Sequence, residues 1–281
     1  MTNRKQPTLT IPTEDAQAST SQGSITFIGN ATVLIRYAGF TILTDPNFIH
    51  AHEQVPVGYG LHATRLKDPA MDIGDLPPLD LVLLSHFHGD HFDQVAERDL
   101  DKALPIMTNP QAARELRHRG FAAAHPLQTW EPFLSDKGNT RLRITATPGW
   151  HGPAIVGALL PDVMGSIVEF EEAGNTLVRI YISGDTLVID DLKEIPARYP
   201  NIDLALLHLG GTQVLGIMVT MDGKQGVELL QIVNPQRAIP IHYDDYDLFK
   251  SPLSDFQEEV RAAGLESKVQ YLERGGTFTF P

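Results

Sequence analysis

The chain has 281 residues, of which 42% are hydrophobic and 20% are charged, a composition typical of a folded globular protein. Its formal net charge of −13 argues against a nucleic-acid-binding surface, which needs clustered Lys and Arg to neutralise phosphates, and against docking on anionic lipid. Cysteine is absent, which excludes disulfides, thiolate metal ligands and a cysteine nucleophile.

The beginning of the chain predicts a flexible tail. Residues 1–23 are rich in Thr, Gln, Ser and Pro, and no apolar segment follows Arg4 and Lys5, so a signal peptide is not indicated. We expect a single domain over residues 24–281. No apolar run reaches the ~18 residues of a membrane span, and the lack of cysteine suits a reducing compartment, so a cytoplasmic location is expected.

Three β-rich runs open the domain, at residues 25–28, 32–37 and 40–44, with a turn at Ala38-Gly39. Residues 47–78 then read as a long loop. A loop of this length is usually functional or mobile, so we expect it to form a lid and a wall of the substrate site, with Tyr59 and His62 contacting the substrate.

A buried strand is predicted at residues 79–84, where the sequence is almost continuously apolar. Directly after it, His86, His88, Asp90 and His91 follow one another in the pattern H-x-H-x-D-H. A polar loop that is merely rich in histidine is one interpretation. The other is half of a metal site at the end of a strand, and it is favoured because imidazole and carboxylate are ligands that Zn²⁺ and similar ions take.

Strands and helices alternate through the remainder of the chain. Further strands are predicted at residues 104–108, 141–147, 166–171, 176–182, 202–207 and 238–241, with a final strand or pair within 269–280. Helices are predicted at residues 92–100, 110–119, 188–198, 222–234 and 254–263.

Polar residues that suit a metal site also follow three of the later strands: His151, Asp185 and His242. Each signal is weak when taken alone, and Asp185 by itself is better explained as a turn former. Their repeated position after an apolar strand, matching that of the histidine motif, favours a shared site.

These segments resemble the metallo-β-lactamase-fold hydrolase superfamily, and most closely its branch containing ascorbate-6-phosphate lactonase and N-acylphosphatidylethanolamine phospholipase D. The resemblance extends from about Ser24 to the end of the chain. The segments that carry it are residues 27–32, 42–46 and 84–91, His151, residues 183–186 and residues 241–242. It implies an α/β protein with an αββα sandwich, in which two mixed sheets pack face to face with helices outside.

The resemblance also implies a dinuclear metal centre. By position, one metal would take His86, His88 and His151, the other would take Asp90, His91 and His242, and Asp185 would bridge them. Two divalent ions are expected, with Zn²⁺ first and Mn²⁺ or Fe²⁺ as alternatives. Asp45 is expected either to orient a histidine ligand or to cap the turn before Pro46.

The implied reaction is hydrolysis of an ester or lactone by a metal-bridging hydroxide, with Asp185, Asp90 and His208 as catalytic residues. Either Asp185 or His208 would pass a proton to the leaving oxygen. Trp150 and Thr220 join the expected substrate residues. The chain departs from the family pattern at Asn30, Thr220 and His208-Leu209, and this leaves the substrate open.

Three alternatives stay open. A phosphoester hydrolase would use the same site, although no Lys or Arg cluster lies near the motifs to hold an anion. The other two are an iron-dependent oxidoreductase and a non-catalytic metal-binding protein of the same fold. The expected partner is a small-molecule ester, lactone or phosphoester, with no nucleic acid and no membrane span, and no oligomeric state is predicted.

Overall fold

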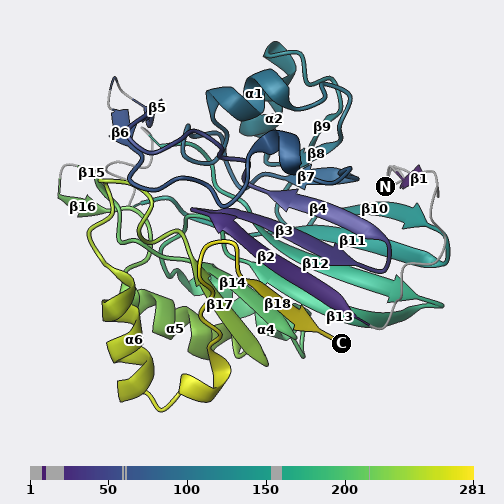
Figure 1. Ribbon diagram of the computed structural model, residues 1–281. Helices are drawn as coiled ribbons and strands as arrows, with labels where there is room; N and C mark the ends of the chain where they lie inside the picture. The colour runs from purple at the N-terminus through teal and green to yellow at the C-terminus, as the bar shows by residue number, and fades with distance from the viewer. Residues whose placement is uncertain (1–7, 11–21, 59, 61, 153–159, 215) are drawn as a thin grey trace.

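Two seven-stranded sheets pack face to face in the computed structural model, with helices on their outer surfaces (Figure 1). The structure describes residues 8–10, 22–58, 60, 62–152, 160–214 and 216–281. Both sheets are mixed, containing parallel and antiparallel pairs. The predicted αββα sandwich is therefore confirmed.

The first sheet combines an antiparallel half with a parallel half. Its strands, in spatial order, are β18 (Thr277–Phe280), β2 (Gly23–Gly29), β3 (Thr32–Tyr37), β4 (Phe40–Thr44), β7 (Leu81–Leu83), β8 (Ile106–Thr108) and β9 (Ala124–Pro126). The turn between β3 and β4 places Ala38 and Gly39 at φ values of 49° and 83°, as the predicted turn requires. From β4 to β9 the pairs are parallel, so these strands end at one edge.

The second sheet also combines antiparallel strands with parallel strands. Its order is β1 (Thr8–Thr10), β10 (Pro132–Lys137), β11 (Thr140–Thr147), β12 (Gly165–Glu172), β13 (Asn175–Ile182), β14 (Leu204–His208) and β17 (Arg237–Ile241). The strands from β10 to β13 are antiparallel, whereas β13, β14 and β17 are parallel. The expected tail differs in one respect, because Thr8–Thr10 pairs with Leu134–Asp136 of β10.

Helices cover both outer faces, as Figure 1 shows. Over the first sheet lie α1 (Gln94–Asp99) and α2 (Pro110–His118), and over the second lie α4 (Glu194–Arg198), α5 (Gly223–Val233) and α6 (Leu253–Ala262). Side chains of Asp93, Asn109 and Asp222 cap α1, α2 and α5 by accepting a backbone N–H. Within the described residues, no helix is long and apolar enough to cross a membrane.

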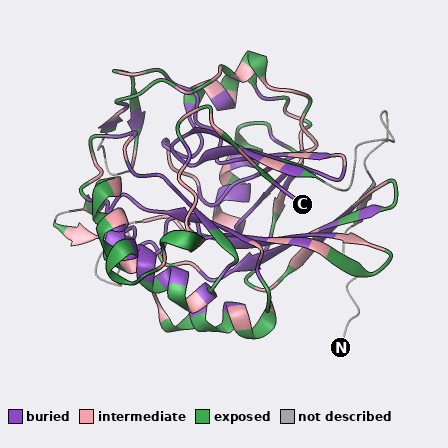
Figure 2. Cartoon of the chain, turned by 60° about the horizontal axis from the view of Figure 1, so that its bottom comes forward, coloured by how far each residue is buried: buried purple, intermediate pink, exposed green. Residues whose placement is uncertain are grey.

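The core lies between the two sheets, where the purple, buried segments of Figure 2 concentrate. Alternate residues of neighbouring strands point into it, for example Ile35 and Ile42 from the first sheet and Ile144 and Ile180 from the second. Two further apolar clusters fill the spaces between each sheet and its helices. This packing on both faces explains why strands such as β7 are continuously apolar.

The segment predicted as a long loop is more ordered than expected. It contains the antiparallel pair β5 (Gln54–Pro56) and β6 (His62–Thr64) and a short 3₁₀ helix, η1 (Ile73–Asp75). A second small pair, β15 (Gln213–Val214) and β16 (Ile217–Met218), was not predicted. In Figure 1 both pairs lie at the same end of the sandwich. Such two- and three-residue strands are too short for a periodic pattern to reveal them.

Two other predicted elements are shorter than expected. The helix predicted at residues 188–198 consists of a 3₁₀ turn, η2 (Asp190–Lys193), followed by α4. The predicted final strand or pair reduces to β18, preceded by η3 (Glu266–Lys268) and by a single bridge from Val269 to Ala238.

Candidate metal centre

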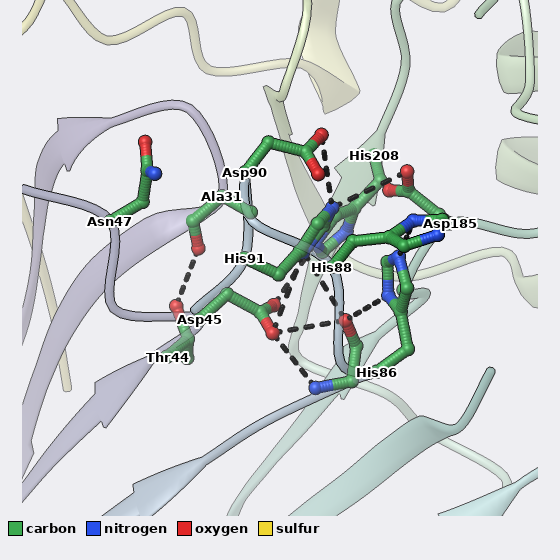
Figure 3. A network of polar contacts seen from close by, with 12 residues as sticks. Ala31, Thr44, Asp45, Asn47, His86, His88, Asp90, His91, Asp185 and His208 are labelled. Carbon is green, nitrogen blue, oxygen red and sulfur yellow. Dashed lines mark hydrogen bonds and ion pairs between the residues drawn. The ribbon is translucent and has the colours of Figure 1, made fainter. Parts of the chain in front are cut away.

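Seven imidazole and carboxylate side chains converge in one cluster, part of which Figure 3 shows. Strand ends supply all of them: His86, His88, Asp90 and His91 follow β7, His151 follows β11, Asp185 follows β13 and His242 follows β17. Their nitrogen and oxygen atoms form two groups, and the atoms of each group lie within 4.8 Å of one another. His86, His88 and His151 make the first group, and Asp90, His91, Asp185 and His242 make the second. The structure thus brings together the seven residues predicted as ligands.

The spacing within each group suits a bound cation. His86 Nε2 lies 3.1 Å from His88 Nδ1 in the first group. In the second, His91 Nε2 lies 3.4 Å from Asp185 Oδ2, and His242 Nε2 lies 3.4 Å from Asp90 Oδ2. Two ligands held about 2.0–2.1 Å from one ion in tetrahedral geometry are separated by roughly 3.4 Å. Both groups therefore match the separation of ligands around a metal ion.

Three buried polar atoms of the cluster have no hydrogen-bond partner among the described residues. They are His91 Nε2, Asp90 Oδ1 and Asp185 Oδ1. Buried groups of this kind are costly unless something satisfies them. A cation at the centre of the cluster would do so, and the residues present therefore fit the metal that the histidine motif indicates.

The electrostatics of the cluster favour metal ligation. Burial lowers the pKa of His88 to about 3, so this ring is neutral near pH 7. Burial alone would raise the pKa of Asp90, but the charges of His91 and His242 lower it to about 2. Burial acts against protonation of His91, yet Asp185 and Asp90 outweigh it and place its pKa well above 6.5. A cation would take the place of that proton.

In three histidines of the cluster, the Nδ1 atom contacts a neighbouring group outside the seven ligands. His151 Nδ1 lies 2.9 Å from the carbonyl oxygen of Val219, and His242 Nδ1 lies 3.1 Å from that of Leu209. His86 Nδ1 lies 3.0 Å from Ser85 Oγ. Carbonyl oxygens only accept, so His151 and His242 donate from Nδ1, and Nε2 of each ring is the atom that would carry the lone pair for a metal.

Asp45 lies behind the cluster between two histidines, as Figure 3 shows. Its Oδ1 accepts hydrogen bonds from the backbone and hydroxyl of Ser85 and lies 3.6 Å from His91 Nδ1. Its Oδ2 lies 3.5 Å from His208 Nε2. Of the two roles left open by the sequence, this geometry matches the orientation of a histidine.

His208 itself is completely buried beside Asp45 and His91, where the ligand atoms of the three residues lie within 4.8 Å of one another, and its Nδ1 lies 3.2 Å from Ser183 Oγ. It does not line the described part of the cavity over the cluster. A direct proton transfer from His208 to a substrate does not fit this position. The imidazole instead supports Asp45, which in turn faces His91.

Buried hydrogen bonds through Asn30, which were not predicted from the sequence, join Asp90 to His242. We call this arrangement, which Asp245 supports, the Asn30–Asp245 clamp. Asn30 donates from its side-chain amide to the carbonyl oxygen of Asp90 at 2.6 Å, and its own carbonyl accepts the backbone N–H of His242 at 3.0 Å. Asp245 Oδ2 accepts the backbone N–H of Asn30 at 2.8 Å. Arg65, fully buried, faces Asp245 Oδ1 at 3.4 Å. The signal in the sequence is the acidic pair Asp244-Asp245, which lies two residues after His242.

An apolar cavity lies directly above the metal-facing atoms. Its lining consists of Val57, His88, Asp90, His151, Leu160, Asp185, Thr212, Gln213, Val214, Val219 and Leu248. No Lys or Arg occurs among these described lining residues. A larger open cavity of about 620 Å³ adjoins it, and His151 borders both.

The predicted substrate residues are placed differently from expectation. Trp150 is 44% exposed and lines the larger cavity, not the one over the cluster. Thr220 is completely buried and donates its hydroxyl to Asp185 Oδ2 at 3.1 Å, so it contacts a metal-facing carboxylate. His62 is exposed on β6 and does not line the described part of the cavity. Tyr59 lies outside the described residues.

Comparison with known proteins agrees with this geometry. Residues 41–243 match the family described as the beta-lactamase superfamily domain. A UPF0173 metal-dependent hydrolase of Carboxydothermus hydrogenoformans is 29% identical over 87% of this chain and 95% of its own length. An isothiocyanate hydrolase from Delia radicum gut bacteria has a TM-score of 0.76 and 24% identity, covering 91% of this chain and 98% of that one.

A possible metal-dependent hydrolase from Veillonella parvula likewise has a TM-score of 0.76 and 24% identity, over 93% of this chain and all of that one. The family match covers most of the chain, and the two solved structures share its fold. With the buried cluster of imidazoles and carboxylates at the sheet edge, these findings show that the chain belongs to the beta-lactamase superfamily and is a metal-dependent hydrolase with the metallo-β-lactamase fold.

Proposed function

We propose that this hydrolase binds two divalent cations and cleaves an uncharged carboxylic ester or lactone. The observation that carries the proposal is the cavity above the metal centre. Its walls are formed by aliphatic side chains, among them Val57, Leu160 and Val214, and none of its described lining residues is a Lys or Arg. An apolar wall favours an uncharged substrate because burying an unpaired charge there costs free energy.

Phosphoester hydrolysis is the second candidate, and the same lining argues against it. With two divalent cations bound, the charges of Asp90 and Asp185 would be offset, so only the cations would attract an anionic phosphoester. Proteins that bind phosphate usually add Lys or Arg side chains or a helix N-terminus. The described lining residues of the cavity include no Lys or Arg, whereas an uncharged ester does not need one.

Within this proposal, His86, His88 and His151 would hold one cation, and Asp90, His91, Asp185 and His242 would hold the other. When bound, the cations polarise a carbonyl oxygen and lower the pKa of water, and Zn²⁺ suits these nitrogen and oxygen ligands. Asp185 is held by the Thr220 hydroxyl at Oδ2 and has no hydrogen-bond partner at Oδ1 among the described residues. It is therefore placed to accept a proton from the attacking water and return it to the leaving oxygen.

The aliphatic walls have a separate part in the reaction. Val219 and Leu248 limit water around the reacting carbonyl and contact the apolar part of the substrate. The partner is accordingly a small-molecule ester or lactone.

Substrate preference tests the proposal. The zinc-loaded protein is assayed with phenyl butyrate, δ-valerolactone and bis(p-nitrophenyl) phosphate, and allyl isothiocyanate is included because of the structural neighbour. We expect kcat/KM for an ester or lactone to exceed that for the phosphodiester by at least about 100-fold, roughly 2.7 kcal/mol of transition-state stabilisation. A preference for the phosphodiester, or turnover of the isothiocyanate alone, contradicts the proposal.

A further inference from the structure

One hydroxyl in the wall of the cavity has no hydrogen-bond partner among the described residues. Thr212 is only 9% exposed, yet its Oγ has no hydrogen-bond partner among the described residues. The same residue lines the cavity together with Asp90, His151 and Asp185. A buried hydroxyl without a partner is costly, and Thr212 is the lining residue of this cavity whose hydroxyl lacks one among the described residues, so a ligand in the cavity could supply the partner.

Thr212 is held in a fixed position relative to the metal centre. Its carbonyl oxygen accepts the backbone N–H of Val219 at 2.8 Å, and the carbonyl of Val219 faces His151 Nδ1 at 2.9 Å. The preceding Gly211 donates its N–H to the carbonyl of Met221 at 2.9 Å. Thr212 is thus linked to the metal-facing imidazole of His151 through two successive hydrogen bonds of the Val219 backbone. Rotation of its side chain is the main freedom left to Thr212.

The turn that delivers Thr212 tolerates little change. Gly210 and Gly211 have φ values of 99° and 57°, which favour glycine. A Cβ at Gly211 would approach the Cβ of Ser251 to 2.8 Å, and one at Gly210 would lie 2.7 Å from the carbonyl oxygen of His242. The close packing of this turn against the segment that carries His242 places Thr212 at the cavity.

We propose that the Thr212 hydroxyl donates a hydrogen bond to the leaving-group oxygen of the substrate and thereby selects oxygen esters and lactones. The inference rests on the proposed function. An uncharged ester has two oxygens, and its carbonyl oxygen would face the metal centre. The ester oxygen would then need a donor from the cavity wall, where Thr212 lies beside Gln213, while Val57, Val214 and Leu248 would contact the alkyl or aryl groups.

The chemical step balances as an ordinary hydrolysis. The oxygen of water bonds to the acyl carbon, and the bond from that carbon to the leaving oxygen breaks with its electron pair moving to the oxygen. The leaving oxygen gains the proton that water lost, so the products are an acid and an alcohol, or one hydroxy acid from a lactone. Thr212 stabilises the charge that develops on the leaving oxygen and keeps its own proton.

A pair of substrates differing in one atom tests this role. Phenyl butyrate and S-phenyl thiobutyrate have the same acyl and aryl groups, but sulfur is a weak hydrogen-bond acceptor. In the zinc-loaded protein, Thr212→Val is expected to lower kcat/KM about tenfold for the oxygen ester and less than about twofold for the thioester. Thr212→Ser, which keeps the hydroxyl, is expected to stay within about threefold of the wild type on both.

The quantity compared is kcat/KM for the oxygen ester divided by kcat/KM for the thioester, measured in one preparation. Metal loss or partial unfolding lowers both rates equally and therefore leaves this ratio unchanged. Thr145→Val is the matched control, because Thr145 is another buried threonine whose Oγ lacks a partner among the described residues but which does not line the cavity. Its ratio should equal that of the wild type. Equal losses on both substrates in Thr212→Val overturn the inference while leaving ester hydrolysis intact. A wild type that cleaves only bis(p-nitrophenyl) phosphate overturns the proposed function as well.

Discussion

Three of the metal-facing side chains are held by contacts with residues outside the group of seven ligands. Thr220 holds Asp185 Oδ2, and backbone carbonyls hold the Nδ1 atoms of His151 and His242. Such contacts fix the tautomer of an imidazole and the orientation of a carboxylate before a metal arrives. Thr220, which the sequence predicted as a substrate contact, instead holds the carboxylate of Asp185.

Asp185 is a residue whose loss should weaken the second group of ligands. It lies 3.4 Å from His91 Nε2 and 3.5 Å from His242 Nε2. Asp185→Asn removes the negative charge and is expected to reduce bound metal and to lower kcat at least about 100-fold. Metal analysis of the purified variant and ester kinetics measure the two effects.

Asp190→Asn is the control, since Asp190 is an exposed neighbour paired with Lys193. It should retain metal and activity. Wild-type metal content and turnover in Asp185→Asn would remove Asp185 from the site.

At the scale of elements, the turn between β2 and β3 and the segment after β17 are joined by Asn30 and Asp245. Asn30 and His242 both adopt left-handed backbone, with φ values of 51° and 61°. Asn30 tolerates this conformation better than most residues, and its carbonyl accepts the backbone N–H of His242. The buried pair of Arg65 and Asp245 supports the turn from behind.

This arrangement predicts that two adjacent carboxylates, Asp245 and Asp244, contribute very differently to the free energy of unfolding. Asp245→Asn removes the carboxylate that faces both the fully buried Arg65 at 3.4 Å and the largely buried Arg274 at 2.7 Å, and is expected to lower the free energy of unfolding by about 3 kcal/mol. Asp244→Asn removes an ion pair with Lys67, whose side chain is 48% exposed, and is expected to cost less than about 1 kcal/mol. Urea unfolding of both variants measures the difference, and equal losses would show that the buried pair contributes no more than a surface pair.

Much of this element-scale organisation could be predicted from sequence because strand periodicity and the histidine motif are local signals. The ends of β7, β13 and β17 were located closely enough to place Asp90, Asp185 and His242 at one edge. The Asn30–Asp245 clamp could not be predicted, because it joins residues 215 positions apart through backbone groups. The unpartnered hydroxyl of Thr212 is likewise visible only once its surroundings are known.

At the scale of the whole molecule, both sheets contribute to the site. The first sheet supplies the histidine motif, and the second supplies His151, Asp185 and His242. A bound cation therefore links the two layers and should stabilise the sandwich by mass action. The aliphatic core between the sheets holds the layers in register without it.

Metal affinity is expected to rise with pH. In the metal-free protein, Asp185 and Asp90 outweigh burial and raise the pKa of His91 above its ordinary 6.5, and Asp185 raises that of His242 in the same way. The protons on these rings stabilise the metal-free fold below about pH 6.5, and this contribution is lost as pH rises through the raised pKa values. Metal must displace these protons, so zinc competition against a chelator should show affinity increasing from pH 6 to pH 8. An affinity independent of pH over this range would contradict the protonation scheme.

The most direct measurement combines metal content with ester hydrolysis on one preparation. The account predicts about two divalent ions per chain, loss of phenyl butyrate hydrolysis when a chelator removes them, and recovery when Zn²⁺ is returned. Circular dichroism of the chelated protein checks that the fold remains. Undiminished ester hydrolysis by a folded, metal-free chain would contradict the account, and so would a fully metal-loaded chain that hydrolyses no ester or lactone.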